Sequence, residues 1–124
     1  MKDNQIHILF IDDNEDILAM LKVMLEYNEY KVSVKDNTSN IKEVIKDLQP
    51  HIIIMDMLLS GSDGCEVCKE LKMDTAFASI PVIMISAHPQ AEAECLAAGA
   101  DFFIEKPFEM NDLLQTVAGV VNTI

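Results

Sequence analysis

Arginine is missing from this chain of 124 residues, and all nine of its cationic side chains are lysines. They are opposed by 21 aspartates and glutamates, so the formal net charge is −12. Proteins that bind nucleic-acid phosphates or anionic lipid headgroups need clustered cations. The composition therefore argues against direct binding to nucleic acid and against docking on a membrane surface.

Long apolar segments and a disulfide framework are also absent from the sequence. No apolar run approaches the ~20 residues that span a membrane, and residues 1–4 lack the apolar segment of a signal peptide. The three cysteines, Cys65, Cys68 and Cys95, are an odd number without framework spacing. We expect a cytoplasmic protein, without membrane insertion, whose thiols are reduced and buried or half-buried.

What the sequence does contain is enough apolar material for a core. Hydrophobic residues make up 50% of the chain, which argues against disorder despite the charge. The length matches a domain of roughly 100–150 residues, and no linker, internal repeat or low-complexity tract divides the chain. We expect residues 1–124 to form a single domain.

Two hydrophobic periodicities alternate along the chain. Short apolar or alternating runs predict five strands: Ile6–Ile11, Tyr30–Val34, Ile52–Met55, Ile80–Ile85 and Phe102–Ile104. After each strand, apolar residues at three- and four-residue spacing predict a helix: around residues 17–25, 41–48 and 67–71, then at Gln90–Ala98 and Glu109–Val121.

Local signals predict where several elements begin and end. Thr38 or Ser39 is the expected N-cap of the second helix, and Gly99 is expected to end the fourth. A Gly-rich loop is predicted at Ser60–Gly64. The strict alternation of strands and helices predicts an α/β fold: a doubly wound, five-stranded parallel sheet with helices on both faces.

Polar side chains that can carry chemistry follow four of the predicted strands. Asp12 and Asp13 follow the first strand and Asp56 the third. Ser86 follows the fourth strand, and Lys106 follows the fifth. Because ligands of open parallel sheets bind outside the carboxyl ends of the strands, we expect these five side chains to share one rim.

Three carboxylates on one rim repel each other unless a cation lies between them. At ~4 Å and an effective dielectric constant of ~20, each pair costs on the order of 4 kcal/mol. A few hard oxygen ligands suit Mg²⁺, or Mn²⁺ in its place. A metal ion, an ammonium and a hydroxyl can together surround a phosphoryl group. Asp56 is the best candidate for a nucleophile that forms an aspartyl phosphate, because the adjacent pair Asp12-Asp13 is placed to hold metal.

Each of these residues has a plainer interpretation when it is taken alone. An Asp-Asp pair after a strand is commonly a turn and a helix cap, and Lys106 could be one more solvated lysine. Their joint placement favours a phosphoryl site. A phosphohydrolase is disfavoured because Leu58 stands where a second acid would be needed. A flavin-phosphate site is disfavoured because the acidic residues 12–15 would repel the phosphate.

The order and spacing of these motifs resemble the response-regulator receiver domain, the phosphoacceptor of two-component signalling, in its chemotaxis-regulator-like form. The matching segments are Asp12-Asp13, Asp56, Asp63-Gly64, Ser86-Ala87, Gly99-Ala100-Asp101 and Lys106-Pro107-Phe108. The resemblance covers essentially the whole chain. It implies a flavodoxin-like fold with strand order 2-1-3-4-5 and no output domain. It also implies a protein that is not an enzyme in the ordinary sense and catalyses only its own phosphorylation and dephosphorylation.

The resemblance further implies a role for each residue of the motif. Asp56 would receive a phosphoryl group from a phosphohistidine on a sensor kinase or a phosphotransfer protein. Asp13, Asp56 and the backbone carbonyl of Leu58 would bind the metal ion directly, and Asp12 would act largely through water. Lys106 would contact the phosphoryl oxygens.

The same resemblance implies a conformational switch and a cis peptide bond. Ser86 would move toward the phosphoryl group and let Phe103 turn inward, which alters the face that binds a downstream protein effector. The Lys106-Pro107 bond would be cis.

Several positions depart from the family pattern. Leu59-Ser60 replaces a common Met-Pro pair, Ser86 replaces Thr, and Phe103 replaces Tyr. The segment from Ser86 to Gly99 is short, so we expect a short or displaced fourth helix. Without arginine, the charged dimer contacts of transcription-factor receivers are not supported, and we expect a monomer or a weak dimer. The remaining alternative is a receiver-like interaction module that works without phosphorylation.

Overall fold

The computed structural model describes residues 5–59, 62–88 and 90–124. Its main sheet has five parallel strands in the order β2-β1-β3-β6-β7. These strands are β1 (His7–Ile11), β2 (Lys31–Lys35), β3 (Ile52–Asp56), β6 (Val82–Ser86) and β7 (Phe102–Glu105). Counted as the five strands of this sheet, the order is 2-1-3-4-5, so the predicted topology is confirmed.

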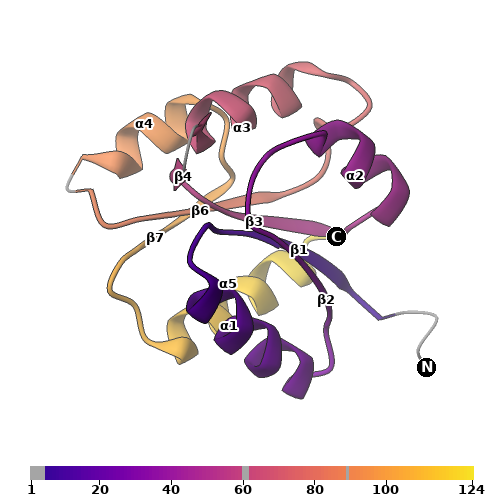
Figure 1. Cartoon of the computed structure of the whole chain (residues 1–124), viewed down its shortest axis with the longest axis vertical. Coiled ribbons are helices and arrows are strands. Elements are labelled where there is room, and N and C mark those ends of the chain that lie inside the picture. Colours follow the sequence, from indigo (N-terminus) through magenta and orange to yellow (C-terminus); the bar gives the residue numbers. More distant parts are fainter. Residues whose placement is uncertain (1–4, 60–61, 89) are drawn as a thin grey trace.

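Helices cover both faces of the sheet (Figure 1). The helices are α1 (Glu15–Tyr27), α2 (Ile41–Leu48), α3 (Gly64–Met73), α4 (Ala91–Ala97) and α5 (Met110–Val121). Figure 1 shows α2, α3 and α4 on one face and α1 and α5 on the other. None of the helices in the described part of the chain is long and apolar enough to cross a membrane.

The sheet separates two hydrophobic cores. One core joins β1, β3 and β6 to α2, α3 and α4, with Met55, Cys68 and Leu71 among its fully buried members. The other joins the sheet to α1 and α5 and includes Phe10 and Leu21. The strands β1, β3 and β6 are buried at every position, because helices cover both of their sides. This burial explains why their sequences are continuous apolar runs.

The ends of two helices follow local chemistry. Asn14 caps α1 by accepting hydrogen bonds from the backbone N–H groups of Asp16 and Ile17. The fourth helix is short, as expected, and Gly99 follows its C-cap with a φ of 100°. A residue with a side chain is strained at this φ, so the predicted role of Gly99 as a helix terminator is confirmed.

The start of α2 differs from the prediction. Its N-cap is Asn40, in a left-handed conformation with φ 53°, and the Asn40 side chain makes no capping hydrogen bond. The backbone carbonyl of Thr38 instead accepts from the N–H of Ile41. Neither Thr38 nor Ser39 is therefore the N-cap. Asparagine tolerates left-handed backbone better than most residues, which lets the chain turn into the helix one residue later.

The predicted Gly-rich loop is in part a small hairpin. Strand β4 (Leu58–Leu59) pairs antiparallel with β5 (Ser62–Asp63), while Ser60 and Gly61 lie outside the described residues. The last predicted loop residue, Gly64, is the first residue of α3. A Cβ atom on Gly64 would meet the backbone of Asp56 and Met57, so this position requires glycine for the close approach of two backbones.

Candidate functional site

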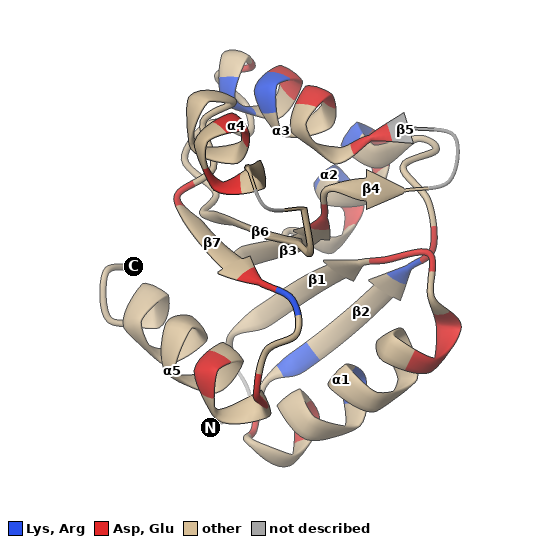
Figure 2. Ribbon diagram, turned by 90° about the vertical axis from the view of Figure 1, so that its left-hand side faces the viewer, with Lys and Arg blue, Asp and Glu red and all other residues tan. Residues whose placement is uncertain are grey.

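The parallel register brings the ends of four strands to one edge of the sheet. Ile11 pairs with Met55, and Asp56 pairs with Ile85. Figure 2 shows the acidic stretch directly after β1 and the lysine directly after β7 at this edge. Asp12 and Lys106 therefore extend from neighbouring parts of the same rim, as the sequence predicted.

Three carboxylates gather at this rim. Asp12, Asp13 and Asp56 each offer an oxygen atom, and these atoms lie within 4.8 Å of one another. Asp13 is exposed, whereas Asp12 and Asp56 are buried. Asp12 Oδ1 accepts a hydrogen bond of 2.9 Å from the backbone N–H of Asn14. Asp12 Oδ2 is buried and has no hydrogen-bond partner.

The unpartnered oxygen makes Asp12 an unfavourable place for a negative charge. Burial raises the pKa of Asp12 above its ordinary value, and the charges of Asp56 and Asp13 raise this pKa further. The Asn14 hydrogen bond and the charge of Lys106 act in the opposite direction. A buried carboxylate oxygen among other carboxylates is stabilised when a cation binds it.

Lys106 is the cation of the site. Its Nζ atom donates a hydrogen bond of 2.8 Å to Asp56 Oδ2 and lies 3.6 Å from Asp12 Oδ2. Burial lowers the pKa of Lys106, but the hydrogen bond and charge of Asp56 and the charge of Asp12 outweigh this and leave the pKa raised. The ammonium group is thus charged at neutral pH. The Lys106-Pro107 peptide bond is cis, as expected.

Backbone groups fix the orientation of the other two site residues. Asp56 Oδ1 accepts a hydrogen bond of 3.2 Å from the N–H of Leu58. The Ser86 side chain is buried, and its hydroxyl oxygen accepts from the N–H of His88 at 3.0 Å. The N–H of Lys106 donates to the carbonyl oxygen of Ser86. The hydroxyl and ammonium positions are therefore coupled through the backbone.

The side chains of two other predicted residues are not part of the carboxylate cluster. The Leu58 side chain is 61% exposed, and its backbone belongs to the β4–β5 hairpin. Phe103 lies on β7 beside Met84 of β6 and packs, partly buried, against the core formed with α2, α3 and α4. Its ring thus belongs to the layer that contains α4.

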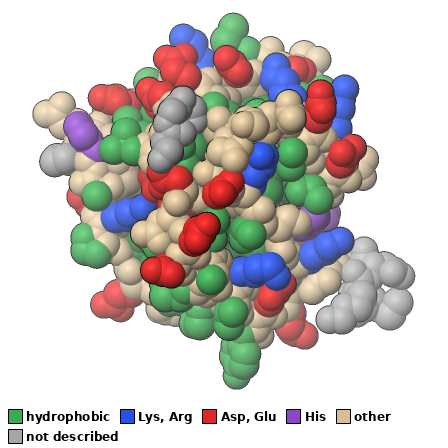
Figure 3. Space-filling view, viewed as in Figure 1, with side chains coloured by type: hydrophobic (Ala, Val, Ile, Leu, Met, Phe, Trp, Pro, Cys, Tyr) green, Lys and Arg blue, Asp and Glu red, His purple; other side chains and the backbone are tan. Residues whose placement is uncertain are grey.

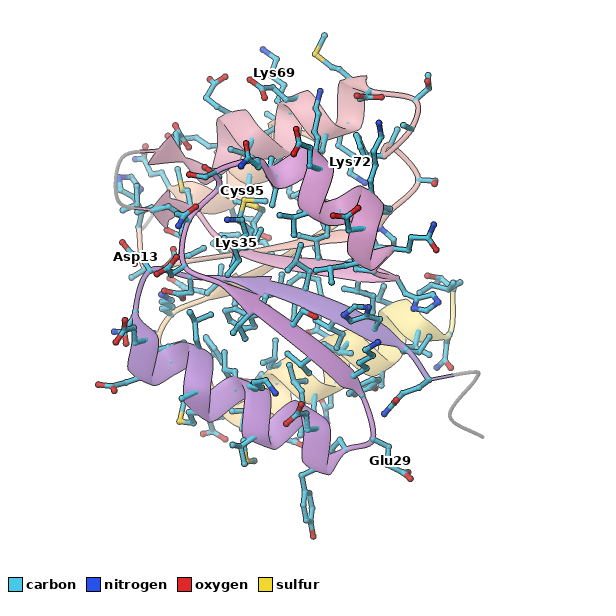
Figure 4. The ribbon with its side chains drawn as sticks, turned by 45° about the vertical axis from the view of Figure 1, so that its right-hand side comes forward. Asp13, Glu29, Lys35, Lys69, Lys72 and Cys95 are labelled. Carbon is cyan, nitrogen blue, oxygen red and sulfur yellow. The ribbon has the colours of Figure 1, made fainter. Side chains whose placement is uncertain are left out.

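Two supports of the site were not predicted as such. The N–H of Asp12 donates to the carbonyl oxygen of Lys35 at the end of β2, and Figure 4 shows Asp13 and Lys35 at the same end of the sheet. The pairing register reveals this contact, and no side-chain pattern signals it. Asn14, which holds both Asp12 and the start of α1, carries a readable signal. An asparagine directly before a helical stretch is a common N-cap.

The donor set of the rim fits a divalent cation. All three carboxylates offer hard oxygen ligands, the kind that Mg²⁺ and Ca²⁺ prefer. The buried, unpartnered Asp12 Oδ2 lacks a donor, which a metal ion or its bound water can replace. The acidic cluster can therefore bind a metal ion.

A parallel α/β fold with an acidic rim, a hydroxyl and a lysine at the carboxyl ends of its strands defines a class of phosphoacceptor domains. The family model described as the response regulator receiver domain matches residues 8–118. The chain belongs to this family. As a receiver domain it is a signalling phosphoacceptor of two-component systems and not an enzyme of the ordinary kind.

Two curated relatives are named as transcriptional regulators. The chain is 34% identical, over 116 residues, to the phosphate regulon transcriptional regulatory protein PhoB of Pseudomonas aeruginosa. The matched region covers 92% of this chain and 51% of PhoB. It is 32% identical to the DNA-binding dual master transcriptional regulator RpaA of a Synechocystis strain, covering 92% of this chain and 48% of RpaA. The chain thus spans about half the length of the curated relatives it matches.

Solved structures share the fold over nearly the whole chain. The receiver domain of a signal transduction histidine kinase from Syntrophus aciditrophicus has a TM-score of 0.87 at 28% identity, covering 95% of this chain and 91% of that one. The receiver domain of sensor histidine kinase PA1611 from Pseudomonas aeruginosa has a TM-score of 0.85 at 23% identity, covering 95% and 98%. That structure holds a magnesium ion in its active-site cleft.

Proposed function

We propose that Asp56 accepts a phosphoryl group from a phosphohistidine, with Mg²⁺ held by the acidic rim. One observation carries this proposal. Asp56 Oδ2 lies 2.8 Å from the Lys106 ammonium, and the Asp56 carboxylate also offers an oxygen within 4.8 Å of oxygens from both Asp12 and Asp13. A nucleophile, a cation and a metal-ligand set thus occupy one small volume, which is the arrangement that phosphoryl transfer requires.

In the transfer step, an oxygen of the Asp56 carboxylate attacks phosphorus while the bond from phosphorus to the donor imidazole nitrogen breaks. The electron pair of that bond leaves with the imidazole. Lys106 contacts Asp56 Oδ2 before transfer and is placed to bind a phosphoryl oxygen afterwards. The Ser86 hydroxyl, which accepts only the His88 N–H among the described contacts, can turn its own hydrogen toward a second phosphoryl oxygen.

The residues that would hold the metal ion are Asp12, Asp13 and Asp56, with the backbone carbonyl of Leu58. Asp13 is the exposed member and can bind directly, whereas Asp12 is suited to act through a metal-bound water. When it is bound, Mg²⁺ neutralises charge on the transferring phosphoryl group. This proposal is supported by the raised pKa of Asp12, which reflects burial among negative charges.

A protein that donates the phosphoryl group must cover the surface next to Asp56. An apolar pocket of about 510 Å³ adjoins Lys106 there, lined by Ile17, Met20, Pro107, Phe108 and Met110. We therefore propose that a phosphohistidine-bearing protein, a sensor kinase or a phosphotransfer protein, rests on this pocket. The output would be a protein effector, bound after Ser86 and Phe103 rearrange.

Direct contact with nucleic acid is not part of the proposal for these residues. The net charge of −12 opposes binding to a polyanion. PhoB and RpaA are named as transcriptional or DNA-binding regulators, and this chain matches about half of their length. We propose that residues 1–124 act as one receiver in the cytoplasm, as a monomer or a weak dimer, and catalyse their own dephosphorylation.

The test is phosphorylation by a small donor. The protein is incubated with acetyl phosphate and Mg²⁺, and its intact mass is recorded. We expect one phosphoryl adduct, absent when Mg²⁺ is chelated and absent in Asp56→Asn. Asp63→Asn is the matched control, because Asp63 is an exposed carboxylate that caps α3 outside the acidic rim. A folded protein that gains no adduct would favour the phosphorylation-independent interaction module. An adduct that survives Asp56→Asn would overturn Asp56 as the phosphoacceptor.

A further inference from the structure

Two buried thiols from different helices are in direct contact. Cys65 Sγ lies 3.4 Å from Cys95 Sγ, across 30 residues of chain. Cys65 is in the first turn of α3, and Cys95 is in the middle of α4. All three cysteines of the chain are free thiols. The third, Cys68, lies one turn beyond Cys65 on α3.

The thiol pair lies between the helices and the sheet. Figure 4 shows Cys95 inside the layer formed by α2, α3 and α4. Cys95 is fully buried, and Cys65 is 9% exposed. Both belong to the same core cluster as Ala91, and Phe103 packs against that cluster. The pair therefore joins the two helices at a point where small side chains let them approach closely.

The two ends of this contact border different parts of the site. Cys65 follows Asp63 and Gly64, which close the hairpin after Asp56. Cys95 belongs to the helix that follows Ser86. A covalent bond between the sulfurs would fix the segment after the phosphoacceptor to the helix after the hydroxyl.

We propose that Cys65 and Cys95 are a site of disulfide formation that locks α4 to α3 when a peroxide oxidises the protein. From their 3.4 Å contact, the sulfurs need to approach by roughly 1.4 Å to reach a disulfide bond length. Because the thiols already touch, no helix has to be displaced far to form the bond.

The chemistry takes place in two steps with hydrogen peroxide as the oxidant. Cys65, the more exposed thiol, attacks one peroxide oxygen as its thiolate. The O–O bond breaks, the hydroxide that leaves takes up the proton lost by the Cys65 thiol and becomes water, and Cys65 becomes a sulfenic acid. The Cys95 sulfur then attacks the Cys65 sulfur, the S–O bond breaks, and a second water leaves. Two thiols and one peroxide thus become one disulfide and two waters.

The surroundings make this reaction slow in the folded protein. Burial raises the pKa of Cys65 and raises that of Cys95 to about 12. The charged side chains that act on the pair, Asp63, Glu66 and Glu94, are all acidic and disfavour a thiolate. The site thus responds to sustained oxidant and remains reduced during brief exposure.

The test uses the full chain in its reduced form. The protein is treated with hydrogen peroxide, the remaining thiols are alkylated under denaturing conditions, and the product is analysed without reductant. We expect an intact mass that is lower by two hydrogen atoms before alkylation, and one alkylated cysteine, Cys68. A protease that cuts after glutamate separates Cys65 from Cys68 at Glu66 and identifies the linked peptides.

Single variants complete the test. Cys68→Ser is the matched control and should form the disulfide at the wild-type rate, whereas Cys65→Ser and Cys95→Ser should not form it. The oxidised wild type should unfold at a higher temperature than the reduced protein, and a thiol reductant should reverse the shift. A disulfide that involves Cys68, a disulfide between two chains, or oxygen addition without a cross-link would overturn the proposal. Because phosphorylation of Asp56 adds mass and disulfide formation removes it, the two proposals fail independently.

Discussion

At the scale of single residues, Asp12 is the carboxylate of the site whose negative charge is opposed both by burial and by the charges of Asp56 and Asp13. Its Oδ2 atom is buried without a hydrogen-bond donor, and the Lys106 ammonium that opposes its charge is closer to Asp56. A carboxyl whose pKa is raised on folding binds its proton more tightly in the native state. Stability therefore falls as the pH rises from the ordinary pKa of an aspartate to the raised pKa of the folded protein, and the loss is complete above the folded pKa.

Replacing the Asp12 carboxylate tests whether its charge destabilises the protein. We expect Asp12→Asn to raise the free energy of unfolding in the absence of metal by on the order of 1 kcal/mol, because a repulsive buried charge is removed. The stabilisation that Mg²⁺ gives the wild type should shrink strongly. Urea unfolding with Mg²⁺ and with a chelator measures both effects, and Glu70→Gln, at an exposed position on α3, is the control. An unchanged response to Mg²⁺ would remove Asp12 from the metal site.

A second residue-scale prediction concerns Gly64. The Cβ of alanine at this position would meet the backbone of Asp56 and Met57, so one of the two segments must move. We expect Gly64→Ala to lower the free energy of unfolding by about 1–3 kcal/mol and to slow phosphorylation, because Asp56 is one of the displaced residues. Gly119→Ala in α5 is the matched control. Its Cβ meets nothing, and it should be stabilising by roughly 0.5–1 kcal/mol.

At the scale of elements, a histidine joins β1 to β2 and α2 at the end of the sheet opposite the site. His7 Nδ1 lies 3.2 Å from the Leu48 carbonyl oxygen and must donate to it, so Nε2 can accept from the Ser33 hydroxyl at 2.8 Å. The His7 N–H donates to His51 Nδ1. Burial lowers the pKa of His7, and the charge of Lys31 lowers it further. The hydrogen bond to Leu48 acts in the opposite direction but does not cancel the two. In this arrangement each imidazole uses one unprotonated ring nitrogen as an acceptor: Nε2 of His7 and Nδ1 of His51.

This junction predicts a dependence of stability on pH. Because the pKa of His7 is lowered on folding, the unfolded chain takes up the proton first as the pH falls below about 6.5. The stabilisation is complete above this pH and is lost as the pH falls toward the folded pKa. Urea unfolding at a series of pH values should show this loss, and His7→Gln should reduce it, while the exposed His88→Gln should not. A wild-type slope retained in His7→Gln would assign the effect elsewhere.

The elements also show what the sequence could and could not predict. Strands buried on both faces are continuous apolar runs, so β1, β3 and β6 could be predicted directly. The β4–β5 hairpin was missed because a strand of two residues has no periodicity to detect. The cap of α2 was misassigned because a left-handed Asn40 leaves no more signal than the hydroxyl residues before it. The contact between Cys65 and Cys95 depends on how two helices pack, which spacing within one helix does not report.

The site was predictable for a related reason. In a parallel sheet, the residues at and just beyond the carboxyl end of each strand occupy a known edge, so Asp12, Asp56, Ser86 and Lys106 could be placed together without a structure. Their hydrogen-bond partners could not. The Lys35 carbonyl that holds Asp12 and the His88 N–H that holds Ser86 are backbone groups, and any residue at those positions would supply them.

At the scale of the whole molecule, negative charge outweighs positive charge. Figure 3 shows acidic side chains scattered over the visible face with fewer lysines between them. A net charge of −12 repels small anions over roughly a Debye length, about 10 Å at 0.1 M salt. Acetyl phosphate is such an anion. We expect its reaction with the protein to accelerate as KCl is added, because the salt screens this repulsion.

The measurement is the initial rate of adduct formation at several KCl concentrations. Mg²⁺ is kept saturating at each concentration, so that weaker metal binding in salt does not mask the effect. A rate that is flat or falls with KCl would mean that the local field at the rim, where Lys106 lies, outweighs the field of the whole molecule.

The division of the interior into two cores has a mechanical consequence. Among the described residues, the buried cluster under α2, α3 and α4 and the cluster under α1 and α5 lie on opposite faces of the sheet and have no member in common. We therefore expect that one layer can repack while the other stays in place. In the proposed switch, Ser86 and Phe103 would rearrange within the first layer, while the pocket beside Lys106 is lined by α1 and the start of α5. If both proposals hold, the sheet would separate donor docking from output: the α1–α5 side could stay bound to the protein that delivers the phosphoryl group while the α3–α4 side changes shape.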